Sequence, residues 1–317
     1  MERYYSYSKY LQNKYGVKTY KLPVHIPVSC PNRDGNIGVG GCTFCGEEGA
    51  GFENSPQKRS VKKQLFEMRE YIGENYGAEK FIAYFQSFTN TYLPLNKLKK
   101  YIRESMEVED IVEIALSTRP DCISERYLNQ LNSLVKRIKP EISLSLELGL
   151  QTVNYHILKE VKRGHGLAEF IDAVLRIREK GMKVGVHLIL NLPGDNMVDV
   201  IENARILSAL KIDNVKLHAL YIREGTVMGD LYREGKLKII SMEEYIERVI
   251  VFLEHLDPEI AVQRLLGRAP EEKSLFVNWD HSWWKIHDLI IKEMEARDTF
   301  QGSKFNYLNG SALGKFN

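Results

Sequence analysis

Three of the four cysteines of the 317-residue chain lie close together in the sequence, at Cys30, Cys42 and Cys45. A glycine-rich stretch separates the first from the second, and the last two form a Cys-x-x-Cys pair. Three thiolates are one ligand short of a closed tetrahedral zinc site or of a fully ligated four-iron cluster. Because catalysis at a metal needs an open position for substrate or cofactor, the spacing predicts a catalytic metal centre.

The composition is typical of a soluble globular protein, with 44% hydrophobic and 27% charged residues and a net charge of +2. This charge neither requires nor excludes a nucleic-acid partner. No apolar run approaches the roughly 20 residues that a membrane span requires, and the N-terminus lacks the apolar core of a signal peptide. Four cysteines in so long a chain do not make a disulfide scaffold. We therefore expect a cytoplasmic protein without a membrane partner.

Six short apolar or β-branched runs alternate with amphipathic helical patterns. The predicted strands cover residues 22–28, 80–85, 112–117, 142–148, 183–190 and 215–221, and the predicted helices cover residues 61–76, 95–106, 124–138, 168–180, 197–210, 242–256 and 284–296. In the fourth helix, the residues spaced as one buried face are Phe170, Ile171, Val174, Leu175 and Ile177. A further helix rich in tyrosine is expected near the N-terminus, packed over the bottom of the sheet.

This alternation is typical of an α/β fold with a parallel sheet and helices outside it. Six units fall short of an eight-unit barrel, so we predict a partial (β/α)6 barrel of the TIM type with helical N- and C-terminal extensions. We expect one domain over residues 1–317, with the core barrel at about 20–225 and the C-terminal extension at about 226–317. The loops after the strands form the active-site face of such folds. Since Cys30 follows the first strand, the cysteines should open into the mouth of the barrel.

Several motifs at these strand ends resemble those of radical S-adenosylmethionine (SAM) enzymes. They are Cys30-Pro-Asn-Arg-Asp-Gly with Gly-Gly-Cys42-Thr-Phe-Cys45, Ser117-Thr-Arg-Pro-Asp-Cys122, Glu147-Leu-Gly-Leu-Gln-Thr152, Lys162-Arg-Gly-His165 and Leu192-Pro-Gly194. More narrowly, the chain is similar to the YhcC/YtqA group, relatives of the catalytic domain of the Elongator tRNA-modifying subunit. The resemblance covers nearly the whole chain. The first cysteine gap is longer than in the commonest Cys-x3-Cys-x2-Cys spacing of the superfamily, and that longer gap is typical of this subgroup.

The resemblance implies two cofactors, a [4Fe–4S] cluster and SAM. Cys30, Cys42 and Cys45 would hold three irons, and SAM would chelate the fourth. One electron, from a donor such as flavodoxin or ferredoxin, would cleave SAM to a 5′-deoxyadenosyl radical that abstracts hydrogen from the substrate.

The same resemblance assigns SAM contacts to further residues. Phe44 would pack on the adenine, and Arg163 would pair with the SAM carboxylate, for which a guanidinium is geometrically suited. Backbone carbonyls of Gln86, Ser87 and Phe88 would receive the amino group. Gln151 and His187 match positions near the ribose, and Ser117 matches another SAM-contacting position. The sequence assigns no catalytic acid or base.

The resemblance implies tRNA as the substrate and partner. In the branch similar to YtqA, the reaction would convert 5-carboxymethylaminomethyl-uridine at the wobble position to 5-aminomethyl-uridine. Two alternatives remain open at this point: a radical SAM enzyme that acts on a small metabolite or peptide, and a non-catalytic protein that binds an iron–sulfur cluster and SAM.

Some of these residues also have plainly structural interpretations. The cysteines would form a zinc knuckle if they borrowed a histidine such as His25. Cys122 is better interpreted as a packed thiol than as a fourth ligand. Arg119 and Asp121 would either brace each other in a turn or contact substrate, and His165 is expected to cap the helix that follows it.

Overall fold

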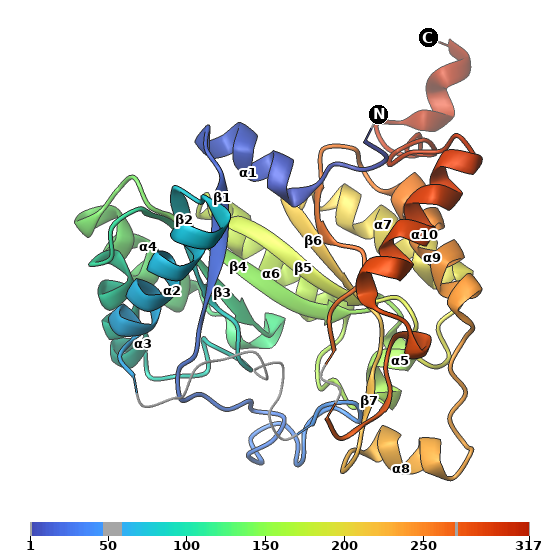
Figure 1. The fold of residues 1–317 in the computed structure, drawn as a ribbon, viewed down its shortest axis with the longest axis horizontal. Helices are drawn as coiled ribbons and strands as arrows, with labels where there is room; N and C mark the ends of the chain where they lie inside the picture. The colour runs from blue at the N-terminus through green and yellow to red at the C-terminus, as the bar shows by residue number, and fades with distance from the viewer. Residues whose placement is uncertain (1, 47–58, 270–271, 317) are drawn as a thin grey trace.

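A curved parallel sheet forms the centre of the molecule. The computed structural model describes residues 2–46, 59–269 and 272–316. Its main sheet has seven strands, all parallel, in the order β1-β2-β3-β4-β5-β6-β8. Helices cover the outer side of this sheet (Figure 1). This is the partial α/β barrel that the sequence predicts, with one strand more than expected.

The six predicted strands are confirmed, but the first begins three residues earlier and ends four residues earlier than predicted, while the others change little at their ends. The strands are β1 (Thr19–Val24), β2 (Lys80–Phe85), β3 (Ile111–Thr118), β4 (Ser143–Gln151), β5 (Lys183–Ile189), β6 (Asn214–His218) and the unpredicted β8 (Ala261–Arg264). A separate antiparallel pair joins β7 (Ile222–Arg223) to β9 (Ser274–Phe276). Because strands β1 to β6 pair in sequence order, each connection crosses only to the neighbouring strand.

The predicted helices are confirmed, and two short helices were not predicted. The helices are α1 (Tyr7–Tyr15), α2 (Val61–Tyr76), α3 (Leu95–Met106), α4 (Glu125–Ile138), α5 (Tyr155–Glu160), α6 (Leu167–Glu179), α7 (Met197–Ala209), α8 (Val227–Arg233), α9 (Met242–His255) and α10 (Trp283–Ala296), of which α5 and α8 are the two that were not predicted. In α6, Phe170, Val174 and Ile177 are fully buried in the core between helices and sheet. Leu175 was wrongly placed on that face, since it is 57% exposed. Among the described residues, we find no helix with the length and apolar character to cross a bilayer.

Helix α1 covers the amino ends of the strands and connects the two edges of the sheet (Figure 1). It contacts both edge strands, β1 and β8. Just before the helix, the backbone N–H of Val262 in β8 donates to the carbonyl of Tyr5 (2.8 Å). Leu11 is buried against Ile82 and Ala115 from the inner side of the sheet. The predicted helix over the barrel bottom is therefore present, and the opposite end, where the strands finish, stays available for a site.

Candidate functional site

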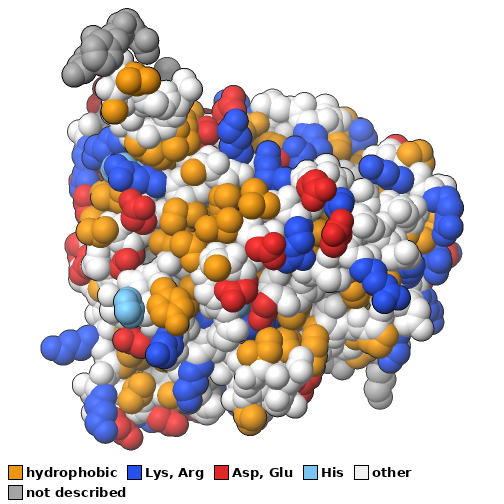
Figure 2. Space-filling view, turned by 180° about the vertical axis from the view of Figure 1, so that it is seen from behind, with side chains coloured by type: hydrophobic (Ala, Val, Ile, Leu, Met, Phe, Trp, Pro, Cys, Tyr) orange, Lys and Arg blue, Asp and Glu red, His pale blue; other side chains and the backbone are white. Residues whose placement is uncertain are grey.

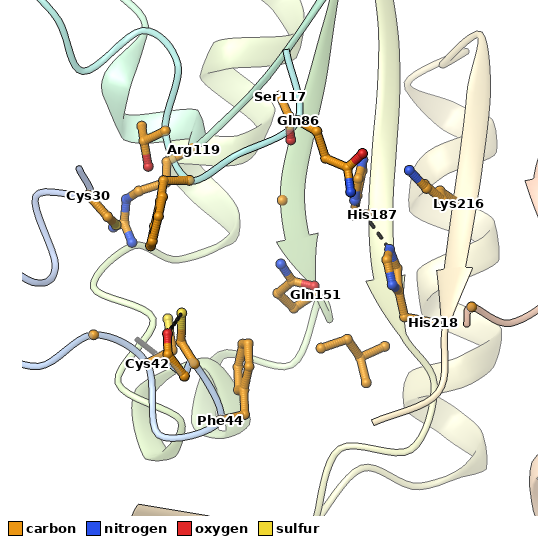
Figure 3. A pocket seen from close by; sticks show the side chains of 18 of the residues that line it. Cys30, Cys42, Phe44, Gln86, Ser117, Arg119, Gln151, His187, Lys216 and His218 are labelled. Carbon is orange, nitrogen blue, oxygen red and sulfur yellow. Dashed lines mark hydrogen bonds between the residues drawn. The ribbon is translucent and has the colours of Figure 1, made fainter. Parts of the chain in front are cut away.

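A cavity of about 210 Å³ lies at the carboxyl ends of the strands. Ten of the eleven predicted site residues line it, namely Cys30, Cys42, Phe44, Cys45, Gln86, Phe88, Ser117, Gln151, Arg163 and His187 (Figure 3). The eleventh, Ser87, turns its side chain away from the cavity. Its hydroxyl is fully buried and lies 2.8 Å from Nδ1 of His25. The parallel sheet thus gathers residues from five strand ends into one place.

The cysteine segment is fastened to the barrel by its backbone. The N–H of Thr43 donates to the carbonyl of Val161 (3.1 Å), and the carbonyl of Thr43 accepts from the N–H of Met228 (3.0 Å). Phe44 packs against a small apolar cluster, which consists of Ile157, Val161, Ile189, Leu192, Leu220 and Met228. Contacts from α5 and α8 therefore fix the Cys-x-x-Cys pair relative to the strands.

Two of the thiols, those of Cys42 and Cys45, lie next to N–H donors. All four cysteines are free. The Arg33 guanidinium lies 3.5 Å from Sγ of Cys45, and Sγ of Cys42 lies 3.5 Å from both Asn32 Nδ2 and Arg163 Nη1. Burial and the neighbouring Cys42 raise the pKa of Cys45, while Arg33 acts in the opposite direction. Such donors offset negative charge on sulfur, which suits thiolates that bind a metal cluster.

The arrangement fits a cluster better than a single zinc ion. Among the residues that the structure describes, no three His, Cys, Asp or Glu side chains come close enough to hold one metal ion. The ligands of a four-iron cluster bind different irons, so they face a shared space and need not converge on one atom. His25, the histidine considered for zinc, is engaged by Ser87 and does not line the cavity.

Two arginines approach the cavity beside the cysteines. Arg163 donates from Nη2 to the carbonyl of Gly149 (2.6 Å). Arg119 forms a two-point contact with Asp121, with Nε–Oδ1 at 2.9 Å and Nη2–Oδ2 at 2.6 Å. The bracing interpretation of this pair is therefore confirmed. Within the described chain, Nη1 of Arg119 and Nε of Arg163 are buried without a hydrogen-bond partner, so both arginines retain capacity for an anionic ligand.

Backbone strain is present at two residues of the cavity wall. Gln151, at the end of β4, has φ of +82°, and Phe88, after β2, has φ of +49°. Positive φ is uncommon for residues other than glycine, and it persists where the surrounding structure fixes it. After β2, the Asn90 amide provides that constraint by donating to the carbonyls of Phe85 and Ser117 (2.8 Å each). The strand ends are thus held in one conformation facing the cavity.

On the other side of the cavity, strands β5 and β6 carry a pair of stacked histidines. Nδ1 of His187 lies 3.2 Å from Nε2 of His218, and Nε2 of His187 lies 2.9 Å from the carboxylate of Glu147. Burial lowers the pKa of His187 to about 4, and burial together with the nearby Arg264 holds the pKa of His218 well below its usual value. Both histidines are therefore neutral at pH 7. Since both ring nitrogens of His187 are used inside the protein, its expected contact with the SAM ribose stays a prediction.

The sequence reasoning missed three polar residues that line this side, namely Lys216, His218 and Arg264. A signal for two of them exists in the sequence. Lys216 and His218 alternate with Val215 and Leu217, so one face of a central strand is polar where a buried parallel strand is usually apolar on both faces. Arg264 had no such signal, because its strand was not predicted.

Two further expectations have different outcomes. Cys122 lies outside the cavity lining, and burial raises its pKa to about 12, which agrees with a packed thiol.

The prediction that His165 caps α6 was wrong. Gly166 occupies the N-cap position, and its N–H donates to the carboxylate of Glu169 (2.8 Å). A glutamate in the first turn fulfils this role because it reaches back to the free N–H.

Comparisons with known proteins agree with this site. Residues 30–207 match the model of the radical SAM superfamily, and residues 212–296 match that of the Radical_SAM C-terminal domain. The chain is 32% identical to YtqA of Bacillus subtilis (strain 168), over 97% of this chain and 94% of that protein. It is 30% identical to a tRNA uridine(34) acetyltransferase of Methanocaldococcus jannaschii, over 47% of this chain and 26% of that protein.

A solved structure supports the fold. The archaeal Elp3 of Methanocaldococcus infernus, with an N-terminal deletion, has a TM-score of 0.67 to this chain at 19% identity, covering 89% of this chain and 64% of that chain. At this identity the likeness concerns the fold alone. The family models, the full-length relative and the cysteine-lined cavity together show that the chain belongs to the radical SAM superfamily, in the group of YtqA and YhcC.

Proposed function

We propose that Cys30, Cys42 and Cys45 hold three irons of a [4Fe–4S] cluster and that SAM binds at the remaining iron. Membership of the superfamily implies both cofactors and supports an enzymatic role. When bound, they supply a 5′-deoxyadenosyl radical that takes a hydrogen atom from the substrate. The observation that carries this proposal is the meeting of three free thiols in one cavity at the carboxyl edge of the partial barrel.

The residues beside the thiols provide the proposed SAM site. Arg163 would bind the SAM carboxylate, for which its unpartnered Nε and its position beside Cys42 are suited. Phe44 would pack on the adenine, and Gln151 would lie near the ribose. The backbone after β2, from Gln86 to Phe88, would receive the amino group, a role that does not need the Ser87 side chain.

Gly149 gives a test of the role of Arg163. A Cβ added at Gly149 would lie 2.7 Å from Arg163 Nη2 and 3.0 Å from Gln151 Nε2, so both side chains would have to move. Losing one charge-assisted hydrogen bond corresponds to about 1.5–3 kcal/mol, or roughly tenfold or more in affinity. We expect Gly149→Ala to weaken SAM binding by about tenfold in calorimetric titration, with cluster absorbance retained. Gly73→Ala, whose new Cβ makes only ordinary contacts, is the control, and equal affinities for SAM in both variants would contradict the assignment.

For the substrate, we infer the wobble uridine of tRNA. One relative, whose alignment covers half of this chain, is a tRNA uridine(34) acetyltransferase, and the chain aligns with YtqA along nearly its whole length. The proposed reaction converts 5-carboxymethylaminomethyl-uridine to 5-aminomethyl-uridine. The bond between nitrogen and the carboxymethyl carbon breaks, and water supplies the oxygen of the released glyoxylate. The two electrons leave with two hydrogens, which reduce SAM to methionine, 5′-deoxyadenosine and a proton.

The proposed substrate predicts a specific change in tRNA. In a strain that lacks this protein, 5-carboxymethylaminomethyl-uridine derivatives should accumulate at the expense of aminomethyl and methylaminomethyl forms, because the step between them is missing. Mass spectrometry of tRNA nucleosides measures both pools. Complementation with the wild-type chain should restore the profile, while complementation with Cys42→Ala should not. An unchanged profile in the deletion strain would refute the tRNA assignment and direct the search to metabolites and peptides.

A further inference from the structure

The cavity is lined by an excess of positive charge. The basic residues in its wall are Arg33, Arg119, Arg163, Lys216, Arg264 and Arg268, and the described residues that line it include no Asp or Glu. The outer surface differs, because on the face shown in Figure 2 Lys and Arg side chains are interspersed with Asp and Glu. The positive charge of the cavity is therefore a property of the site and not of the whole surface.

These basic residues form two groups on opposite sides of the cavity. Arg33 and Arg163 contact the cysteine sulfurs, so their charges offset those of the thiolates. Lys216 and His218 stand on β6, on the side away from Cys30 and Cys42 (Figure 3), and Arg264 follows on the neighbouring strand β8. This second group is therefore separate from the cysteines that would hold the cluster and from the arginines that contact them.

A directional chain of hydrogen bonds positions Arg264. The ionised Glu147 accepts from Nε2–H of His187, which leaves a lone pair on Nδ1 of that ring. That lone pair accepts from Nε2–H of His218 (3.2 Å), so Nδ1 of His218 accepts from Nη2 of Arg264 (2.8 Å). Because both imidazoles are neutral, they orient the guanidinium without cancelling its charge.

Lys216 is held next to this chain by an aromatic ring. Its Nζ lies 3.3 Å from the hydroxyl of Tyr84 and 4.9 Å from the centre of the Tyr84 ring. A phenol ring stabilises an ammonium group and keeps its positive charge. Two cations, a guanidinium fork and an ammonium group, are thus presented from adjacent strands at one side of a small cavity.

We propose that Lys216 and Arg264 bind the carboxylate of the substrate. This inference rests on the proposed function, in which the substrate side chain ends in a carboxylate. A guanidinium fork and an ammonium group suit that anion, and both side chains line the cavity that the proposed SAM site shares. The product has lost the carboxylate and keeps only the amine that the substrate already carries, so it offers these cations no anion to bind. The site therefore selects substrate over product.

Enzyme variants combined with two RNA substrates, one with and one without the carboxylate, test this site. The probes are anticodon stem-loop RNAs that carry 5-carboxymethylaminomethyl-uridine or its carboxamide analogue. The enzymes are wild type, Lys216→Met, Arg264→Gln and Arg264→Lys, all with the reconstituted cluster. The control is Arg137→Gln, because Arg137 is exposed at the end of α4 that precedes β4, away from the cavity. We measure kcat/KM, the Kd for each RNA without reductant, and 5′-deoxyadenosine formed without substrate.

Lys216→Met and Arg264→Gln should lose about ten- to hundredfold in kcat/KM on the natural RNA and weaken its binding. Arg264→Lys should recover part of the loss, and Arg137→Gln should match wild type in kcat/KM, in cluster absorbance and in substrate-independent 5′-deoxyadenosine. On the carboxamide RNA, wild type and both variants should be equally slow, because the interaction is already absent. Losses that are the same on both RNAs would overturn the proposal. If wild type converts neither RNA, the proposed function fails, and this carboxylate site fails with it.

Discussion

Alanine at Cys30, Cys42 or Cys45 is expected to remove the iron–sulfur absorbance of the reconstituted protein and to abolish SAM cleavage. Each thiolate would hold a different iron, so a variant with only two of these ligands should not retain the cluster. The described residues that line the cavity include no other cysteine and no Asp or Glu, and its two histidines stand on the side away from Cys30 and Cys42. The measurements are the visible absorbance spectrum, the iron content and the yield of 5′-deoxyadenosine under reducing conditions.

Cys122→Ala is the matched control for these variants. Cys122 lies outside the cavity lining, and its thiol has a raised pKa, so it is poorly suited to act as a ligand. This variant should keep both the absorbance and SAM cleavage at wild-type levels. Full activity of Cys42→Ala, or loss of the cluster in Cys122→Ala, would show that the ligands are wrongly assigned.

The sequence was sufficient for the main features of the fold because they depend on local patterns. Strands β2 and β5 and helices α2 and α3 have apolar periodicity over their whole length, and the prediction finds them within a residue or two. Strand β8 was missed because Ala261–Arg264 is only four residues long and ends in Gln263 and Arg264. A strand of this kind is defined by its pairing with β6, which no local pattern reveals.

The sequence predicts which residues reach the candidate site, because the carboxyl ends of parallel strands lie at one edge of the sheet. The position of Cys30 after the first strand and of Gln151 at the end of the fourth is enough to place both at one edge. Side-chain direction was not predictable, as Ser87 shows, because its neighbour His25 comes from a segment far away in the sequence. The link from Glu147 through two histidines to Arg264 involves four strands and likewise appears only in the folded chain.

Glu147→Gln is expected to lower the free energy of unfolding by about 3–5 kcal/mol at pH 7, because it leaves a buried cation without its counter-charge. Glu147 is buried inside the barrel, where it forms an ion pair with Lys21 of β1 and accepts from Gln263 of β8 (2.7 Å) and from His187 of β5. One carboxylate thus joins both edge strands through the interior. Glutamine has nearly the same volume, so the loss measures charge and hydrogen bonding and not a cavity.

The contribution of Glu147 to the free energy of unfolding depends on pH, and the same contacts determine how. Burial alone would raise the pKa of Glu147, but Lys21 and the hydrogen bond from His187 hold it well below its usual range. The stabilisation by Glu147 is therefore complete above the unfolded pKa of about 4.3 and decreases as the pH falls through the lower folded pKa. The difference between wild type and Glu147→Gln in urea unfolding should be constant near neutrality and shrink in acid.

Glu141→Gln is the matched control, since Glu141 is exposed just before β4 and the same substitution there should change stability by less than about 0.5 kcal/mol. An equally small effect at Glu147 would mean that the rings of Tyr7 and Tyr84, which lie 4.9 and 4.6 Å from Lys21 Nζ, are sufficient to stabilise that cation. A large effect would establish Glu147 as the residue that holds the open barrel together. It would also show that the hydrogen-bond chain toward Arg264 begins at a carboxylate that stabilises the fold.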